Sequence, residues 1–364
     1  AVLEKGANYI LHYFPNEYDR GAFGDKTFFK NASDKQLKYF PKNYWKGLIK
    51  DVNHICFILS NYYASALDGI ESKKIMTRQA ETKFIQDLRH KKELQNKFSW
   101  TLCYYPTKAS AKEAGLTEKE FTQQIVKACF LNKQNPVKEW QDAQKNLIKI
   151  QKWLNNLNLK YIKVKAKDID FKIQIGPNRK WLSGGGHNIP SFEHFITPNN
   201  KFAEGYINFN FPLYRFGKKI TNIKLQFKDG KIVKASAKQN EDLLKQMIKV
   251  KGADRLGEFS LTDKRISKID KFMANTLFDE NYGGEFGNMH VAVGMGYKES
   301  YTGNAKKMTT KDWQNEGLND SAVHTDILDI SEKKVWGIKE SGEEVLIYES
   351  GEFKMELWFK IINY

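Results

Sequence analysis

The stretch that decides the fold class is Ile223-Lys224-Leu225-Gln226-Phe227-Lys228-Asp229-Gly230-Lys231-Ile232-Val233. Apolar and polar residues alternate from Ile223 to Phe227, as they do in a strand with one buried face. The pair Asp229-Gly230 then favours a type I′ turn, which joins two antiparallel strands. The stretch therefore predicts a β-hairpin, and we expect antiparallel pairing in this part of the chain.

The same alternation of apolar and polar residues recurs through the second half of the sequence. Apolar residues alternate again at Ile162-x-Val164 and at Phe171-x-Ile173-x-Ile175, and glycine-rich turns follow. Strands of this kind usually form antiparallel sheets. We therefore predict a C-terminal α+β domain over residues 161–364 that is rich in antiparallel strands.

Helical and strand-like patterns alternate in the first 160 residues. Apolar runs predict strands at Tyr9–Phe14, His54–Ser60 and Ser99–Tyr105. Helices are predicted at Tyr44–Val52, at Ser72–Asn96, from the capping box Thr117-x-x-Glu120, and at Val137–Leu154. Such alternation is typical of a parallel sheet covered on both faces. We therefore predict an N-terminal α/β domain over residues 1–160 with a doubly wound parallel sheet.

Charge and composition limit the classes of function. The chain has 364 residues and a net charge of +16, with 41% hydrophobic residues. This content excludes a wholly disordered protein. Its 59 basic residues comprise 52 lysines and 7 arginines, which indicates a general lysine bias because base recognition favours arginine. Residues 1–250 carry +21 and residues 251–364 carry −5. Nucleic-acid binding is therefore not expected, and binding of another polyanion through the lysines of residues 1–250 stays an alternative function.

Location follows from the apolar runs and the cysteines. Runs such as Ile55–Leu59 fall far short of the ~20 residues that a membrane crossing needs, so no membrane partner is expected. The three cysteines (Cys56, Cys103 and Cys129) are too few and too widely spaced for a disulfide framework or a Cys-x-x-Cys zinc module. We expect a cytoplasmic protein.

Two histidine segments in the acidic last third are candidates for a metal site. In Val323-His324-Thr325-Asp326-Ile327, His324 and Asp326 leave the same face of a strand, which suits metal binding but also an ordinary polar strand face. His290 heads a segment with Gly294 and Gly296, and Tyr297 follows seven positions later. Tyr297 can rejoin the face of His290 only if the strand alternation breaks at one of these glycines.

Carboxylates next to apolar residues complete the candidates. Glu258 follows Leu256-Gly257, and Glu280 ends Leu277-Phe278-Asp279-Glu280. Carboxylates with imidazoles suit zinc, cobalt or manganese, although surface acids are the plainer interpretation of each segment. The loop Trp181–Gly186 lacks the Gly-Lys-Ser/Thr ending of a P-loop, and no Gly-x-Gly-x-x-Gly follows a strand. Nucleotide binding is not supported, and close backbone packing near Glu193 is another use for these glycines.

Taken in order, these segments resemble the aminopeptidase T and aminopeptidase S (PepS) group of dinuclear metallopeptidases. The resemblance rests on five blocks of sequence: Trp181-Leu-Ser-Gly-Gly-Gly186 with Pro190-Ser-Phe-Glu-His-Phe-Ile-Thr-Pro198, Gly252-Ala-Asp-Arg-Leu-Gly-Glu258, Asn275-Thr-Leu-Phe-Asp-Glu-Asn281, His290-Val-Ala-Val-Gly294, and Asn319-Asp-Ser-Ala-Val-His-Thr-Asp326. The first 160 residues resemble the family only in the order of their elements, and they lack its first strand. Ala1–Gly6 reads as the end of a helix, so the natural start is expected upstream.

The resemblance implies a metal-dependent aminopeptidase that releases N-terminal amino acids from peptides. It places the ligands of two divalent ions (Zn, Co or Mn) at Glu193, Glu258, His290, His324 and Asp326. It also places at Tyr297 a tyrosine that donates a hydrogen bond to the tetrahedral oxyanion. The proton carrier is Glu258 itself or a neighbour such as Glu280.

The resemblance also implies a homodimer, and it leaves one further alternative open. That alternative is a catalytically inactive scaffold of the same fold. Two segments depart from the family, because residues 282–289 are longer than in better-known members and the tail continues from Phe353 to Tyr364.

Overall fold

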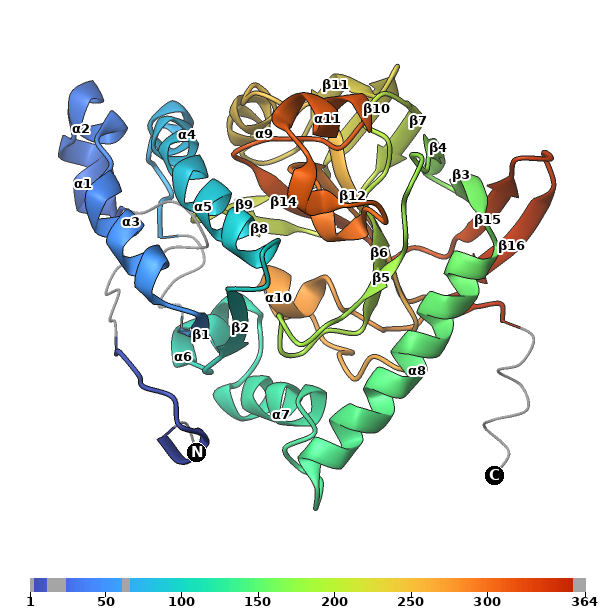
Figure 1. Ribbon diagram of the computed structural model, residues 1–364, viewed down its shortest axis with the longest axis horizontal. Coiled ribbons are helices and arrows are strands. Elements are labelled where there is room, and N and C mark those ends of the chain that lie inside the picture. The colour runs from blue at the N-terminus through green and yellow to red at the C-terminus, as the bar shows by residue number, and fades with distance from the viewer. Residues whose placement is uncertain (1–2, 12–23, 61–65, 356–364) are drawn as a thin grey trace.

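The computed structural model describes residues 3–11, 24–60 and 66–355, which form a mixed α/β fold (Figure 1). Figure 1 shows α1–α5 along one side of the molecule and α6–α8 around the lower end. The elements of the N-terminal part are η1 (Leu3–Lys5), α1 (Lys26–Asn31), α2 (Asp34–Lys38), α3 (Lys42–Asp51), β1 (His54–Leu59), α4 (Ser72–Glu81), α5 (Lys83–Glu93), β2 (Ser99–Tyr104), α6 (Lys108–Glu113), α7 (Glu118–Ala128) and α8 (Pro136–Asn156).

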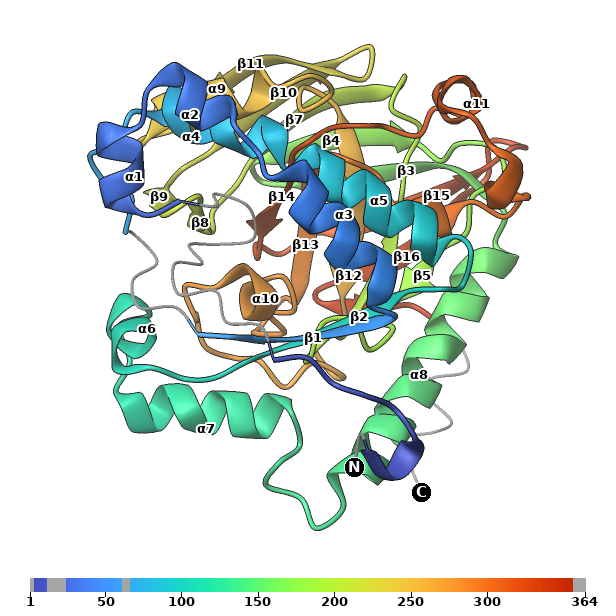
Figure 2. The same cartoon turned by 60° about the vertical axis from the view of Figure 1, so that its left-hand side comes forward.

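The parallel sheet of the N-terminal part is smaller than predicted. Strands β1 and β2 pair in parallel, with His54 opposite Ser99, but among the described residues they form a sheet of only two strands. The free edge of β2 is used by the C-terminal part, because the Leu102 N–H donates to the His187 carbonyl and the Ile189 N–H donates to the Leu102 carbonyl. The predicted doubly wound sheet is therefore wrong in its extent. Figure 2 shows β1 and β2 between α10 and α7.

Two other predictions for this part need correction. The helix predicted at Ser72–Asn96 divides into α4 and α5 at Thr82, where the Thr82 hydroxyl donates to the Gln79 carbonyl. Such side-chain bonds compete with the helical ladder. The strand predicted at Tyr9–Phe14 lies partly outside the described residues, and its described part, Tyr9–Leu11, forms no strand. The capping box of Thr117 and Glu120 is confirmed, and it begins α7.

The C-terminal part is built on two antiparallel sheets, as predicted. The larger sheet has eight strands in the order β11 (Lys231–Ser236), β10 (Lys224–Lys228), β7 (Ala203–Asn208), β4 (Ile169–Gln174), β3 (Leu159–Ala166), β15 (Lys334–Lys339), β16 (Glu344–Glu349) and β17 (Glu352–Phe353). The predicted hairpin joins β10 to β11, and both Asp229 and Gly230 have the positive φ that a type I′ turn requires.

The smaller sheet carries the candidate site. Its five antiparallel strands are β14 (His324–Asp329), β13 (Asn288–Gly294), β12 (Leu256–Thr262), β6 (Glu193–Ile196) and β5 (Leu182–Ser183), in that order. The remaining elements are the hairpin of β8 (Leu213–Arg215) and β9 (Lys218–Ile220), and the short helices α9 (Glu241–Ile248), α10 (Thr276–Asp279), η3 (Lys298–Ser300), η4 (Ala305–Lys307) and α11 (Thr310–Asn315).

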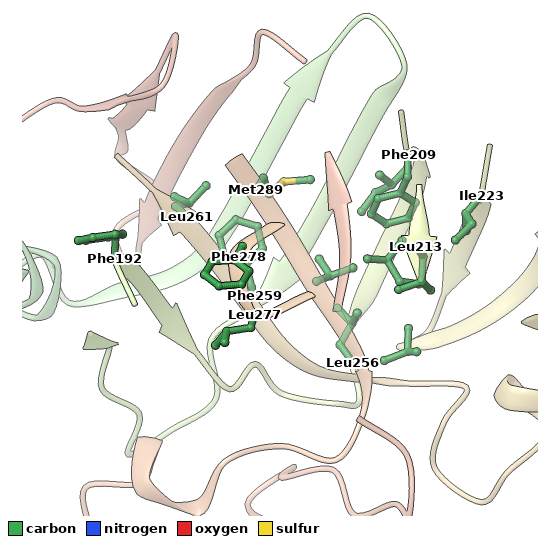
Figure 3. Packing of buried hydrophobic residues seen from close by; sticks show 14 of the residues in the cluster. Phe192, Phe209, Leu213, Ile223, Leu256, Phe259, Leu261, Leu277, Phe278 and Met289 are labelled. Carbon is green, nitrogen blue, oxygen red and sulfur yellow. The ribbon is translucent and has the colours of Figure 1, made fainter. Parts of the chain in front are cut away.

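One hydrophobic core runs through both parts of the chain. It contains residues of the N-terminal helices, such as Phe121 and Leu147, together with residues of both sheets, such as Val164 and Val291. Figure 3 shows Phe259, Leu261 and Met289 on β12 and β13 within this core. Strand β3 begins at Leu159, beside the predicted boundary at residue 160. The division into two domains stays a prediction.

Neither a membrane-spanning helix nor a disulfide is found among the described residues. No helix among them is both long enough and apolar enough to cross a membrane. The three cysteines (Cys56, Cys103 and Cys129) are free thiols.

Candidate metal centre

Four neighbouring strands place the five predicted ligands on one face of the smaller sheet. Residues directly opposite each other in an antiparallel pair share a face, and so do residues two apart on one strand. Glu193 lies opposite Thr262, four residues after Glu258 on β12. His290 lies opposite Ser260, two residues after Glu258. These pairings bring β6, β12 and β13 together at the site.

Strand β14 joins the same face. Asp326 lies opposite Ala292, two residues after His290, and Ala292 also lies opposite Glu258. His324 is two residues before Asp326, as the His-x-Asp spacing predicted. Ala292 thus lies between Glu258 and Asp326 across the three strands.

A β-bulge at Gly257 sets the position of Glu258. The register between β12 and β13 shifts between Leu256 and Glu258. A Cβ atom at Gly257 would lie 2.1 Å from the Met295 carbonyl oxygen, so only glycine allows this close approach. Bulges commonly redirect a side chain at a functional site.

The first group of side chains is Glu193, Glu258 and His290. The Nε2 atom of His290 lies 3.3 Å from Glu193 Oε2 and 3.3 Å from Glu258 Oε1. One ligand atom from each residue lies within 4.8 Å of the others, a spacing that a single metal ion can bridge. The His290 side chain is 1% exposed.

The second group is Glu258, His324 and Asp326. His324 Nε2 lies 3.4 Å from Glu258 Oε2 and 3.3 Å from Asp326 Oδ1. Its three ligand atoms also lie within 4.8 Å of one another. Glu258 therefore belongs to both groups, with one carboxylate oxygen facing each histidine.

Hydrogen bonds orient His324 and bring Tyr297 to it. The Nδ1 atom of His324 lies 2.7 Å from the Met295 carbonyl oxygen, so Nδ1–H donates and Nε2 is the ring nitrogen available to a metal once it loses its proton. The Tyr297 hydroxyl lies 3.4 Å from the same Nε2. Strand β13 ends at Gly294 with φ +106°, so the predicted break in strand alternation before Tyr297 is confirmed.

Neighbouring polar groups hold two of these residues in place. Ser260 Oγ donates to Glu193 Oε2 at 3.0 Å. The Thr197 hydroxyl accepts from the Tyr297 N–H at 2.9 Å and lies 3.2 Å from the Tyr297 carbonyl oxygen. Neither Ser260 nor Thr197 was predicted from the sequence. Ser260 could have been predicted, because it follows Glu258 by two residues on a strand.

The buried side chain of Arg215 donates hydrogen bonds to the strand that carries His324 and Asp326. Arg215 on β8 donates from Nη2 to the His324 carbonyl oxygen at 2.9 Å and from Nε to Thr325 Oγ1 at 3.3 Å. This contact joins segments more than 100 residues apart, and no local pattern of the sequence indicates it.

The charges of the site stabilise protons on its imidazoles. Burial alone would lower the pKa of His324, but Asp326 and Glu258 outweigh it and raise that pKa to about 10. Burial would also lower the pKa of His290, but Glu193 and Glu258 outweigh burial and raise that pKa above its usual value. The pKa of Asp326 lies below its usual range, because His324 outweighs the effect of burial. Burial raises the pKa of Glu193.

Glu280 lies outside both groups. Its buried side chain accepts from Asn188 Nδ2 at 2.8 Å, and its carbonyl oxygen lies 3.3 Å from the Thr262 hydroxyl. In the glycine loop near Glu193, Gly184 packs closely, whereas Gly185 and Gly186 are exposed. A Cβ atom at Gly184 would lie 2.4 Å from Ser191 Oγ, and the Gly184 N–H donates to the Glu193 carbonyl.

The segment at residues 282–289, predicted to be longer than in the family, contacts Ile269 and Tyr348. The Gly283 N–H donates to the Ile269 carbonyl, and a Cβ atom at Gly287 would lie 2.1 Å from the Tyr348 hydroxyl. The part of the predicted tail after Met355 lies outside the described residues.

Comparisons with known proteins find similarity over most of the chain. The model of the thermophilic metalloprotease (M29) family matches residues 4–353. Aminopeptidase AmpS of Bacillus subtilis is 30% identical over 78% of this chain and 73% of its own length. Aminopeptidase PepS of Streptococcus thermophilus is 31% identical over 71% of this chain and 66% of its own length.

A solved structure shows the same fold. Wild-type AmpT from Thermus thermophilus superposes with a TM-score of 0.75 at 22% identity, covering 91% of this chain and 84% of that one.

Proposed function

Because the chain belongs to the thermophilic metalloprotease (M29) family and matches aminopeptidases along most of its length, we propose that it is a two-metal aminopeptidase. Its reaction is the release of N-terminal amino acids from peptides. The proposed ligands are those predicted from the sequence: Glu193, Glu258, His290, His324 and Asp326.

The observation that carries the proposal is the sharing of Glu258 between two ligand groups. The two oxygens of Glu258 lie 3.3 and 3.4 Å from different histidines, so this carboxylate could contribute a ligand to each of two ions. Zinc, cobalt and manganese all accept such mixed carboxylate and imidazole ligands. Three carboxylates and two neutral imidazoles leave about one positive charge when two divalent ions bind.

When bound, two divalent ions supply an activated water and polarise the scissile carbonyl. The residues of the chain do the rest. The Tyr297 hydroxyl donates a hydrogen bond to the oxyanion that forms on the substrate carbonyl. The carboxylate of Glu258, or that of a neighbour such as Glu280, would take the proton that the attacking water loses and pass it to the leaving amine. Arg215 and Ser260 hold His324 and Glu193 in position.

The proposal extends to partners and location. Substrates are peptides with a free N-terminus, and the protein is proposed to act as a homodimer in the cytoplasm, without a membrane or nucleic-acid partner. The presence of all five ligand side chains in two compact groups argues against an inactive scaffold, because a scaffold has no need to keep buried acids beside buried histidines.

Removal and return of metal tests the proposed function. Dialysis against a chelator should abolish hydrolysis of a leucine peptide, and added zinc, cobalt or manganese should restore it. Activity that persists after dialysis against the chelator, with no metal found by elemental analysis, would contradict the proposal. Release of internal rather than N-terminal residues would contradict the aminopeptidase assignment.

Metal affinity should increase with pH. In the metal-free protein the pKa of His324 is raised to about 10, so His324 holds a proton that a metal must displace throughout the neutral range. Loss of one proton per bound ion makes the apparent affinity rise about tenfold per pH unit. Competition with a chelating dye at pH 6.5, 7.5 and 8.5 measures this slope. A metal affinity that is independent of pH would show that metal binding does not displace the proton of His324.

The proton on His324 also affects the stability of the metal-free protein, which should decrease as the pH rises, whereas metal affinity increases. Because the pKa of His324 is raised on folding, its contribution to the free energy of unfolding is fully present below pH 6.5. That contribution is lost as the pH rises through about 10. Urea unfolding of the metal-free protein across this range measures the loss.

A further inference from the structure

Lysines gather on the outer face of the larger sheet, the side that points away from the hydrophobic core. On β3, β4 and β10, the apolar residues Val164, Phe171 and Phe227 are each at most 2% exposed. Val164 is paired with Phe171, and the ring centroids of Phe171 and Phe227 are 5.1 Å apart, so these strands turn the same side inward. Strand alternation therefore places the lysines between these residues on the outer face.

Three pairs of lysines on this outer face stand directly opposite each other on neighbouring strands. They are Lys163 and Lys172 on β3 and β4, Lys165 and Lys334 on β3 and β15, and Lys228 and Lys231 on β10 and β11. Like charges directly opposite in an antiparallel pair destabilise a sheet. The fold therefore keeps an unfavourable arrangement of charge three times on one face, which a bound anion would relieve.

Protection of an open sheet edge explains only part of this arrangement. Lysines on an edge strand discourage pairing between molecules, and β11 is the first strand in the order of the larger sheet. Strands β3, β4 and β15 lie inside that order, with a hydrogen-bonded neighbour on each side. Their lysines have no edge to protect, so the pairs on these inner strands need another explanation.

Acidic side chains neutralise the lysines at one end of the outer face. The ion pairs there are Lys163 with Glu344, Lys165 with Asp170, and Lys334 with Glu349. All three involve lysines of β3 and β15. This end of the face is therefore balanced in charge.

The other end of the outer face stays positive. In the part of the chain that the structure describes, no acidic oxygen lies within 4.0 Å of four of its lysines: Lys172, Lys228, Lys231 and Lys234. The acid opposite Lys172 is Glu204, but its Oε1 accepts instead from the Asp229 N–H at 2.7 Å. The four lysines thus form a positive surface that a negatively charged partner complements.

The positive end is too wide for a single small anion. Lys172 lies on β4, and β11, which carries Lys231 and Lys234, is three strands away in the sheet. Neighbouring strands are about 4.8 Å apart, so this separation is about 14 Å. An extended polypeptide spans it with about four or five residues. The ligand that fits is therefore a chain with several negative charges.

The side chains of the outer face favour carboxylates over nucleic-acid phosphates. None of the described arginines belongs to a strand of the larger sheet, and arginine is the side chain that grips phosphates with two parallel hydrogen bonds. Lys163 Nζ lies 5.2 Å from the ring centroid of Trp336, and Lys172 Nζ lies 4.5 Å from that of Tyr161. Lysines thus occupy ring faces on which bases would stack.

We propose that the outer face of the larger sheet binds an acidic polypeptide segment, whose carboxylates lie among Lys172, Lys228, Lys231 and Lys234. The partner is a protein or peptide that carries several consecutive aspartates or glutamates. This binding is additional to the proposed hydrolysis of peptides and does not rest on it.

Fluorescence anisotropy with a labelled, N-terminally acetylated hexaglutamate peptide tests the proposal, because the acetyl group blocks removal of N-terminal residues. The metal-loaded protein should bind the peptide, and the affinity should fall severalfold between about 50 mM and about 200 mM salt. The combined change Lys172→Gln, Lys228→Gln, Lys231→Gln and Lys234→Gln should weaken binding by about tenfold or more. Wild-type protein that does not bind the peptide at the lower salt concentration would overturn the inference.

A matched control removes four exposed lysines from the region of α6, α7 and α8: Lys112→Gln, Lys119→Gln, Lys133→Gln and Lys138→Gln. This control has the same net charge as the first variant and should bind the peptide as wild type does. Equal unfolding midpoints, measured by circular dichroism, should show that both variants fold.

Two outcomes of the comparison would overturn the inference and leave the proposed hydrolysis standing. An equal loss of binding in both variants would show that total charge, and not the outer face, binds the peptide. Tighter binding of a hexathymidylate than of hexaglutamate, lost in the first variant alone, would assign the face to nucleic acid.

Discussion

Replacement of Glu258 by glutamine is expected to give the largest loss of any single change, because this side chain belongs to both ligand groups. The amide keeps the size of the side chain but removes its charge, so neither group retains its full set of ligands. We expect metal binding to fall at both positions and kcat/KM to fall by at least about 10³-fold, which corresponds to about 4 kcal/mol.

The Glu258→Gln experiment needs both metal analysis and kinetics. Glu344→Gln is a matched control, because Glu344 is an exposed acid that pairs with Lys163 on the larger sheet. The control should keep wild-type metal content and activity. If Glu258→Gln bound two metals with wild-type affinity, Glu258 would not be the shared ligand.

Replacement of Tyr297 by phenylalanine is expected to lower turnover while leaving the metals in place. The change removes one hydroxyl, which lies 3.4 Å from His324 Nε2, and keeps the ring that packs against Phe195. Loss of one donor to an oxyanion typically costs about 10²- to 10³-fold in kcat. Steady-state kinetics with a leucine peptide, combined with elemental analysis, separates this loss from a loss of metal.

The corresponding control is Tyr206→Phe, which removes an exposed hydroxyl on β7 and should leave kcat unchanged. A Tyr297→Phe variant with wild-type turnover would exclude Tyr297 from oxyanion stabilisation. A variant that lost its metal instead would show that Tyr297 acts as a ligand.

Local chemistry explains which elements of the fold could be predicted. The hairpin at residues 223–233 was predictable because Asp229 and Gly230 are residue types that readily adopt the positive φ of a type I′ turn. The caps of α7 and α8 were predictable for the same reason, since Thr117 and Asn135 bond to backbone N–H groups three residues away.

Long-range contacts explain the parts of the fold that were wrong. Among the described residues the parallel sheet has two strands, and residues 187–189 occupy the edge of β2 where a further strand could have paired. That contact links segments about 85 residues apart, and no periodicity records it. The break between α4 and α5 has no proline or glycine to mark it.

The ligand set was recognised from family motifs, and the family assignment is confirmed by the match to the M29 model over residues 4–353. The structure brings the five predicted side chains together, and their binding of metal stays a prediction. Strand alternation could also have indicated Ser260, which lies two residues after the predicted ligand Glu258. Arg215 could not have been found, because its place beside His324 depends on the packing of β8 against β14.

A metal titration of the metal-free protein tests whether Glu258 joins two metal sites that act together. Zinc or cobalt is added stepwise, and bound metal and hydrolysis of a leucine peptide are measured at each step. We expect binding to saturate at two ions per chain and full activity to require both ions. Saturation at one ion per chain with full activity, or full activity with no ion bound, would contradict this expectation.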